Sequence, residues 1–131
     1  MIMKVLVDTS VWSEALRRKE PSQVVDTITE LIIESQTVMI GQIRQELLSG
    51  ISDLVTFNNL KSKLQAFDDL AITTEDYETA ASFNNTCRRQ GIQGSHVDFL
   101  ICAVAHNNNL LILTTDQDFI HYAKFLPIRL M

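Results

Sequence analysis

Short, nearly continuous apolar runs alternate along this chain with longer stretches in which apolar residues recur every three or four positions. The runs have the β-branched character of strands buried on both faces, and the three-or-four spacing is that of amphipathic helices. The pattern predicts strands at residues 2–8, 37–40, 70–72, 110–114 and 127–130. It predicts helices at residues 11–17, 22–34, 41–50, 53–67, 73–89, 95–109 and 116–125.

Small polar residues and glycines stand at several of the expected helix ends. Ser, Thr and Asp side chains accept hydrogen bonds from the free N–H groups of a first turn, and glycine readily adopts the left-handed conformation after a last turn. The expected end residues are Thr9 or Ser10 and Thr73 or Thr74 as N-caps, and Gly50 and Gly91 as terminating glycines.

The alternation of strands and helices predicts the α/β class. Parallel strands need crossover connections, which place helices over both faces of the sheet. The chain has the size of one ordinary domain and contains no internal repeat and no Gly/Ser-rich linker. We therefore expect a single domain over residues 1–131, with a mainly parallel central sheet of four or five strands.

Composition and charge exclude several classes of protein. The apolar share of 46% and the charged share of 21% are those of a globular chain. The longest apolar stretch, residues 99–105, is far shorter than the roughly 20 residues that cross a bilayer, and no secretory signal is recognisable, so we expect a cytoplasmic protein. Cys87 and Cys102 are expected to be reduced, buried thiols. The net charge of -5 argues against nucleic-acid binding through bulk electrostatics.

Four carboxylates occur near the expected carboxyl ends of the strands, the edge at which α/β sheets usually bind ligands. Asp8 ends the first strand, Glu46 lies six residues past the second, Asp98 opens a helix, and Asp116 follows the strand at 110–114.

Each acid also has a purely structural explanation. Asp98 has the spacing of the acid in a capping box, and Asp116 is a good N-cap. Asp118 would then lie in a first turn, where the helix dipole favours it by about 0.3–1 kcal/mol. Glu46 can be a solvent-facing helix residue. Asp8 is harder to explain in this way, because an acid at the end of an apolar central strand needs compensation for its lost hydration.

The coincidence of four acids at one edge favours a binding site over four separate caps. Two like charges about 4 Å apart repel by about 4 kcal/mol at an effective dielectric constant of 20. A divalent cation would neutralise them, and oxygen ligands without a His or Cys constellation select Mg²⁺ or Mn²⁺. The sequence therefore predicts a site for a divalent cation, and Mg²⁺ in such sites commonly joins protein carboxylates to a substrate phosphate.

Three segments carry a resemblance to a known family: "VLVDTSVW" from residue 5, "IGQIRQELLSGI" from residue 40 and "GSHVDFLICAVAHNNNLLILTTDQDF" from residue 94. In order and spacing they resemble the PIN-domain ribonucleases, in particular the VapC toxins of VapBC toxin–antitoxin systems, over essentially the whole chain. The resemblance implies a Rossmann-like α/β/α sandwich and an endoribonuclease that depends on Mg²⁺ or Mn²⁺. It also implies an RNA substrate, frequent homodimers, and a VapB-type antitoxin whose tail enters the acidic site.

The resemblance assigns roles to particular residues. The family's acidic quartet maps onto Asp8, Glu46, Asp98 and Asp116, and its small polar positions map onto Ser10 and Thr114. Asp8, Asp98 and Asp116 are then the main metal ligands, directly or through water. Glu46 binds a second metal or orients the attacking water. Asp118 is either a dipole-favoured helix acid or an accessory ligand through water.

The same residues also bear on several other functions. A haloacid-dehalogenase-type phosphatase needs a second acid two positions after the first, where this chain has "DTS". A receiver domain needs a phosphoacceptor Asp and a Lys that "LAITTEDY" and "PIRLM" do not offer. A catalytically silent PIN-like RNA-binding or interaction module would be expected to have lost one or more acids, and all four are present. A PIN nuclease outside a toxin–antitoxin pair is the remaining alternative.

Contacts with RNA must come from local basic side chains, because the net charge is negative. The candidates are Arg17, Arg18, Lys19, Lys61, Lys63, Arg88 and Arg89, each of which can equally be a solvated helix end. Trp12 is expected in the core rather than against a base. His96 is expected in an exposed capping turn.

Overall fold

Three parallel strands form the sheet in the computed structural model, which describes residues 3–17 and 21–131. They are β1 (Val5–Val7), β2 (Thr37–Val38) and β3 (Leu111–Leu113), in the spatial order β2-β1-β3. Leu6 of β1 is aligned with Val38 on one side and with Ile112 on the other. All three residues of β1 are buried, because a central parallel strand is covered on both faces.

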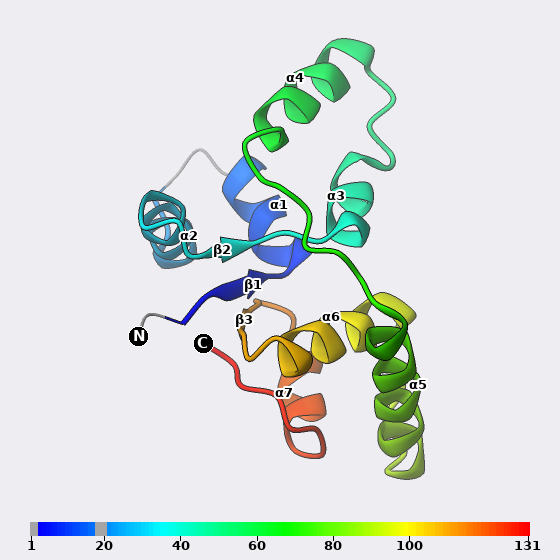
Figure 1. Cartoon of the computed structure of the whole chain (residues 1–131). Helices are drawn as coiled ribbons and strands as arrows, with labels where there is room; N and C mark the ends of the chain where they lie inside the picture. Colours follow the sequence, from blue (N-terminus) through cyan, green and yellow to red (C-terminus); the bar gives the residue numbers. More distant parts are fainter. Residues whose placement is uncertain (1–2, 18–20) are drawn as a thin grey trace.

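Helices connect and cover these strands. They are α1 (Thr9–Arg17), α2 (Gln23–Ile33), α3 (Gly41–Leu48), α4 (Leu54–Leu64), α5 (Thr74–Arg89), α6 (His96–Asn107) and α7 (Asp118–Ala123). In Figure 1 the strands lie between α1 to α4 on one side and α5 to α7 on the other. Helix α1 packs on α2 and α3, and α5 packs along α6. The predicted α/β class with a parallel sheet is confirmed.

The sheet has fewer regular strands than the four or five predicted. Residues 70–72 were expected as a strand, but none of these three residues forms a bridge, and the isolated bridge next to them joins Asp69 to Met39. The Leu70 N–H donates to the Met39 carbonyl at 2.8 Å. Thr73 then serves as the N-cap of α5, so the chain turns away from β2 after a single pairing.

The predicted edge strand at 127–130 is likewise reduced to one bridge, between Leu130 and Ile112. Pro127 has no N–H to donate, and the Ile128 N–H bonds back to the Leu126 carbonyl at 2.8 Å. The backbone can therefore pair with β3 only from residue 129 onward. At the other end of the chain, residue 2 of the predicted first strand lies outside the described residues.

Several predicted helix ends are confirmed by capping geometry. Thr73 and Asp76 form a reciprocal capping box at the start of α5. Gly50 and Gly91 have φ values of 86° and 75° after α3 and α5, in the left-handed region that favours glycine. Helix α4 ends at Leu64, earlier than predicted, and α7 is shorter than the predicted 116–125.

The core is centred on α6, which is buried continuously from Phe99 to Ala105. Cys87 and Cys102 are buried free thiols, as predicted, and burial raises the pKa of both. Trp12 is only 2% exposed and packs edge-on against Phe67, with 5.0 Å between ring centroids, which confirms its expected place in the core. None of the described helices has the length and apolar character that a membrane span requires.

Candidate metal centre

Strands β1 and β3 end side by side, because Val7 is aligned with Leu113 in the parallel register. Asp8 follows β1 directly, and Asp116 follows β3 after two threonines. The chain crosses from β1 to β2 on one side and later enters β3 on the other, so this edge lies at a switch in strand order.

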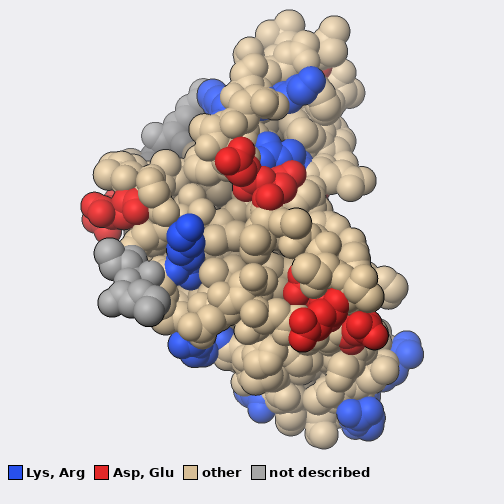
Figure 2. Space-filling model, in the orientation of Figure 1, with Lys and Arg blue, Asp and Glu red and all other residues tan. Residues whose placement is uncertain are grey.

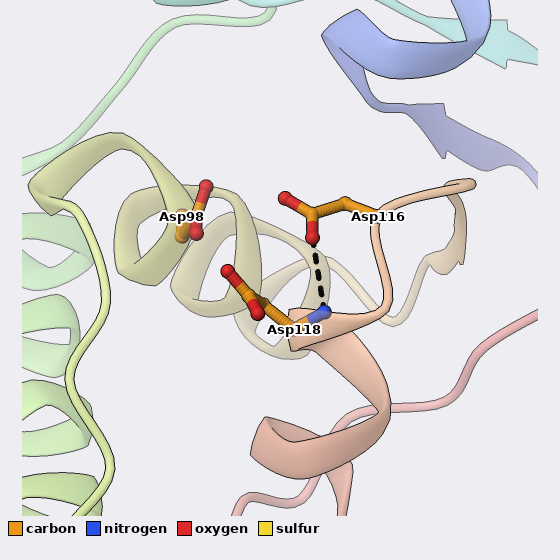
Figure 3. Close-up of side chains that lie close together, drawn as sticks. All are labelled: Asp98, Asp116 and Asp118. Atoms are coloured by element: carbon orange, nitrogen blue, oxygen red, sulfur yellow. Dashed lines mark hydrogen bonds between the residues drawn. The ribbon is translucent and has the colours of Figure 1, made fainter.

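Three carboxylates form a compact group at this edge. Asp98, Asp116 and Asp118 each offer one carboxylate oxygen, and these atoms lie within 4.8 Å of one another. Figure 3 shows the three side chains meeting from the first turn of α6, the loop after β3 and the start of α7. Among the described residues no other set of three or more His, Cys, Asp or Glu side chains has this spacing, so Asp8 and Glu46 lie outside the compact group.

Asp8 is held in place by two hydroxyl groups. It is 6% exposed, and its Oδ2 accepts hydrogen bonds from Ser10 Oγ at 2.8 Å and Thr114 Oγ1 at 2.7 Å. The expectation that Thr9 or Ser10 would cap α1 is wrong. Both residues lie inside the helix, and the Asp8 carbonyl accepts the Val11 N–H at 3.0 Å. The Ser10 hydroxyl is thereby free to hold the Asp8 carboxylate.

Only one of the two hydrogen bonds of the predicted capping box forms at Asp98. Ser95 caps α6 by accepting the Asp98 N–H at 3.0 Å. The Asp98 carboxylate, instead of completing a capping box, accepts a 2.7 Å hydrogen bond from the Tyr122 hydroxyl. Sequence reasoning missed Tyr122, because nothing local links two residues 24 positions apart.

Burial and neighbouring charge act together on Asp98. Desolvation has the largest effect and raises the pKa of the Asp98 carboxyl. Hydrogen bonds from the Tyr122 and Ser95 hydroxyl groups lower this pKa, and the negative charges of Asp116 and Asp8 raise it. A raised pKa means that the charged form is disfavoured in the metal-free protein.

Glu46 lies on the exposed side of α3 but faces the same charges. Desolvation raises the pKa of this carboxyl, and the charges of Asp8 and Asp98 add to the effect. The nearby Thr9 hydroxyl partly opposes the rise. The Thr9 hydroxyl is close enough to act on Glu46, but Thr9 Oγ1 is buried and forms no hydrogen bond of normal geometry with any described residue. The four predicted acids therefore interact electrostatically, although only two of them are in the compact group.

Asp116 does not serve as the N-cap that its position suggested. Helix α7 begins at Asp118, so Gln117 is the cap residue. Asp116 Oδ1 instead accepts the Asp118 N–H at 2.9 Å, the bond drawn in Figure 3. The Asp116 N–H in turn donates to Thr114 Oγ1 at 3.0 Å. These bonds fix the loop so that Asp116 and Asp118 both approach Asp98.

The donor set fits a hard divalent cation. The acids offer oxygen ligands only, which suit Mg²⁺ or Mn²⁺. The raised pKa values of Asp98 and Glu46 reflect in part a repulsion that a cation would relieve. On the viewed face of Figure 2, acidic side chains gather over the ends of α5 and α6, with basic side chains close by to the right and below.

Grooves in the described part of the chain lie on the helices around the acids, and one of them is lined by two of the basic side chains considered for RNA contact. A groove of about 390 Å³ between α1, α3 and α4 is lined by Arg17 and Lys63 with apolar side chains such as Leu16 and Leu60. Of the other basic candidates, Lys61 does not line this groove, Arg88 and Arg89 end α5, and Arg18 and Lys19 lie outside the described residues.

The second groove, of about 380 Å³, runs between α3, α5 and α6. Its lining is mainly apolar and includes Ala80, Ala81, Val97 and Leu100. His96, at the exposed start of α6, stands at this groove rather than in the acidic group.

Several solved structures have a fold similar to that of this chain. A search of curated protein sequences finds no match. FitAcB from Neisseria gonorrhoeae has a similar structure, with a TM-score of 0.78, 22% identity, and coverage of 97% of this chain and 96% of that chain. DNA-bound VapBC from Salmonella typhimurium has a TM-score of 0.78 at 18% identity, covering 99% and 98%. A toxin–antitoxin complex from Klebsiella pneumoniae has a TM-score of 0.64 at 18% identity, covering 88% and 90%.

At these identities the solved structures show a shared fold. The sequence model of the PIN domain matches residues 5–125, which is most of the chain. This match shows that the chain belongs to the PIN-domain family.

Proposed function

We propose that this protein is an endoribonuclease that requires Mg²⁺ or Mn²⁺ and acts as the toxin of a VapBC-type toxin–antitoxin pair. PIN domains are typically nucleases. The observation that carries the proposal is the compact group of Asp98, Asp116 and Asp118, with Asp8 and Glu46 beside it.

In this proposal the acids and hydroxyl groups have different roles in phosphodiester hydrolysis. Asp8, Asp98 and Asp116 would hold the cation, with Asp118 as an accessory ligand. The bound cation supplies charge to polarise the phosphate and to acidify a water molecule. Glu46 lies at the periphery, where it orients the attacking water or serves a second ion. Ser10 and Thr114 keep the Asp8 carboxylate in place.

The groove lined by Arg17 and Lys63 is our candidate for contact with the RNA backbone. It is formed by α1 and α3, which also carry Ser10 and Glu46. Two local cations can attract a phosphate chain even on a protein of net charge -5.

We also propose a VapB-type antitoxin with a basic tail that enters the acidic site. The chains of similar fold include members of the VapBC, FitAcB and toxin–antitoxin complexes described above. A group of three carboxylates is complementary to a cationic side chain, which would compete with the metal. The reading frame adjacent to this gene tests the idea: its product, expressed together with this chain, should relieve growth arrest and suppress RNA cleavage by the purified complex.

A homodimer is the assembly we propose. The groove between α3, α5 and α6 supplies the mainly apolar surface, with Ala81 exposed on it. A second copy would cover the apolar side chains of the groove and remove them from water.

Cleavage of RNA by the purified protein tests the activity. Single-stranded RNA should be cut with Mg²⁺ or Mn²⁺ and left intact with EDTA. Asp8→Asn keeps the size of the side chain and removes its charge, and we expect cleavage to fall by at least about 100-fold, the scale on which loss of a group that stabilises developing charge acts. Asp26→Asn, at an exposed position of α2, is the matched control and should cut at the wild-type rate.

Two outcomes would contradict the proposal. Equal cleavage by Asp8→Asn and the wild type would remove Asp8 from the site. A folded wild-type protein that binds RNA but does not cut it with either metal would instead support the catalytically silent PIN-like module. Growth arrest that needs intact Asp8 would favour a toxin over a nuclease outside a toxin–antitoxin pair.

A further inference from the structure

Tyr122 is a completely buried residue of α7 whose ring is fixed from two sides. It is 0% exposed and lies between Phe99 and Phe119. The centroid of the Tyr122 ring lies 5.1 Å from that of Phe99, at an interplanar angle of 47°. It lies 5.2 Å from that of Phe119, at an angle of 71°. Tilted and edge-on contacts of this kind favour one orientation of the ring. The phenolic oxygen is therefore held at a defined place.

That oxygen donates to Oδ2 of Asp98 at 2.7 Å. Asp98 belongs to the compact group of carboxylates, and Asp118 of the same group opens the helix that carries Tyr122. The hydrogen bond consequently joins α7 to the first turn of α6. It fixes the orientation of the Asp98 carboxylate relative to Asp118.

Gly94 leaves the space that this hydrogen bond needs. A Cβ atom at position 94 would lie 2.4 Å from the Tyr122 hydroxyl oxygen and 2.9 Å from two ring carbons of Phe99. Gly94 does not have a positive φ, so its backbone conformation does not demand glycine. The requirement is for space next to the Tyr122 hydroxyl, because any side chain would push that group away from Asp98.

A buried tyrosine hydroxyl needs a hydrogen-bond partner in any protein, and a backbone carbonyl would satisfy it. Here the partner is a carboxylate in a group of three, which gives a stronger bond to a charged acceptor. Partners of this kind orient the ligands of metal sites, and their loss lowers metal affinity or activity by about 10-fold to 100-fold.

We propose that Tyr122 is the positioning residue for Asp98, and that Gly94 is glycine so that the Tyr122 hydroxyl can reach the carboxylate. The inference rests on the proposed metal-dependent function. It concerns metal binding, which can be measured without RNA.

Calorimetric titration with Mn²⁺ tests the inference. Tyr122→Phe keeps the ring and removes only the hydroxyl, and we expect its Mn²⁺ dissociation constant to rise by about 10-fold to 100-fold. The control is Tyr77→Phe, at the chain's other tyrosine, which is 54% exposed and contacts Gln42 at 3.5 Å. Its Mn²⁺ affinity should equal that of the wild type.

Gly94→Ala is a second variant that displaces the hydroxyl without removing it, and its Mn²⁺ affinity should fall in the same direction. Circular dichroism in EDTA establishes that each variant is folded. Wild-type Mn²⁺ affinity in folded Tyr122→Phe would overturn the inference while leaving the metal site intact. Absence of Mn²⁺ binding by the wild type would overturn the proposed metal site and the inference together, whereas Mn²⁺ binding without RNA cleavage would contradict only the proposed activity.

Discussion

Asp98 and Asp76 are carboxylates whose surroundings shift their pKa values in opposite directions. Desolvation raises the pKa of Asp98, and the charges of Asp116 and Asp8 add to this. Desolvation also acts on Asp76, but hydrogen bonds from the Thr73 backbone and the side chains of Asn107 and Thr73 outweigh it and lower the pKa. The first arrangement disfavours the ionised carboxylate, and the second favours it.

The opposite shifts have opposite consequences for stability. The raised pKa of Asp98 makes the folded protein bind a proton more tightly than the unfolded chain, so the free energy of unfolding falls as pH rises above about 4 through the folded pKa. The lowered pKa of Asp76 contributes stability that is present above about 4 and is lost as pH falls through the folded pKa.

We therefore predict that, in EDTA at pH 7, Asp98→Asn raises the melting temperature and Asp76→Asn lowers it. Each kcal/mol corresponds to about 4 °C in a domain of this size. The gain in Asp98→Asn should shrink toward pH 4, where the wild-type carboxyl takes up its proton. Thermal melts from pH 4 to pH 8 measure both effects. A lower melting temperature for Asp98→Asn at pH 7 would show that this carboxylate is not under repulsion.

Among the contacts between helices, Arg44 of α3 forms hydrogen bonds with the end of α4 and with the segment that follows it. Its guanidinium donates to the Leu64 carbonyl at 2.9 Å, to the Phe67 carbonyl, and through Nε to Asp69 Oδ1 at 3.0 Å. The final carbonyls of a helix lack partners within the helix, and Arg44 supplies one to Leu64. Asp69 forms the bridge to Met39, so Arg44 also stabilises the contact of this segment with the sheet.

We expect Arg44→Ala to lower the free energy of unfolding by about 2 kcal/mol, the scale of hydrogen bonds from a charged group. Arg44→Lys should recover little of this, because an ammonium cannot reproduce the planar fork of donors. Urea unfolding provides the measurement. Arg89→Ala is the control, since Arg89 is exposed and, among the described residues, donates one long bond, of 3.4 Å, to Thr86. Equal stability of Arg44→Ala and Arg89→Ala would contradict the role assigned to Arg44.

At the scale of the whole molecule, the proposed homodimer makes a prediction about mass in solution. Wild-type protein should have the light-scattering mass of two chains. Ala81→Arg places a charge on the exposed wall of the groove between α3, α5 and α6, and we expect it to give one chain at the same concentration. The matched change Ala71→Arg, at an exposed position before α5 and outside this groove, should remain a dimer. A wild-type protein that stays monomeric at all concentrations would rule out this assembly.

The pattern of apolar residues was sufficient to predict the class of fold and the approximate place of each helix, but not the ends of α4 and α7. Those features depend on spacing among neighbours: the run through Val7 reads as a buried strand, and Gly91 follows α5 in the left-handed conformation that its type suggested. The edges of the sheet were not predictable in this way. One hydrogen bond from Leu70 and the missing N–H of Pro127 decided how far those segments pair.

The sequence by itself determined which acids follow strands and open helices, because these positions are set by local periodicity. It left Asp118 as either a helix acid or an accessory ligand. Only the tertiary structure places Asp118 within 4.8 Å of Asp98 and Asp116, and only it turns Tyr122 toward Asp98 and Ser10 and Thr114 toward Asp8. These contacts depend on how α1, α6, α7 and β3 pack, and residues far apart along the chain carry no local signal of where packing will bring their side chains.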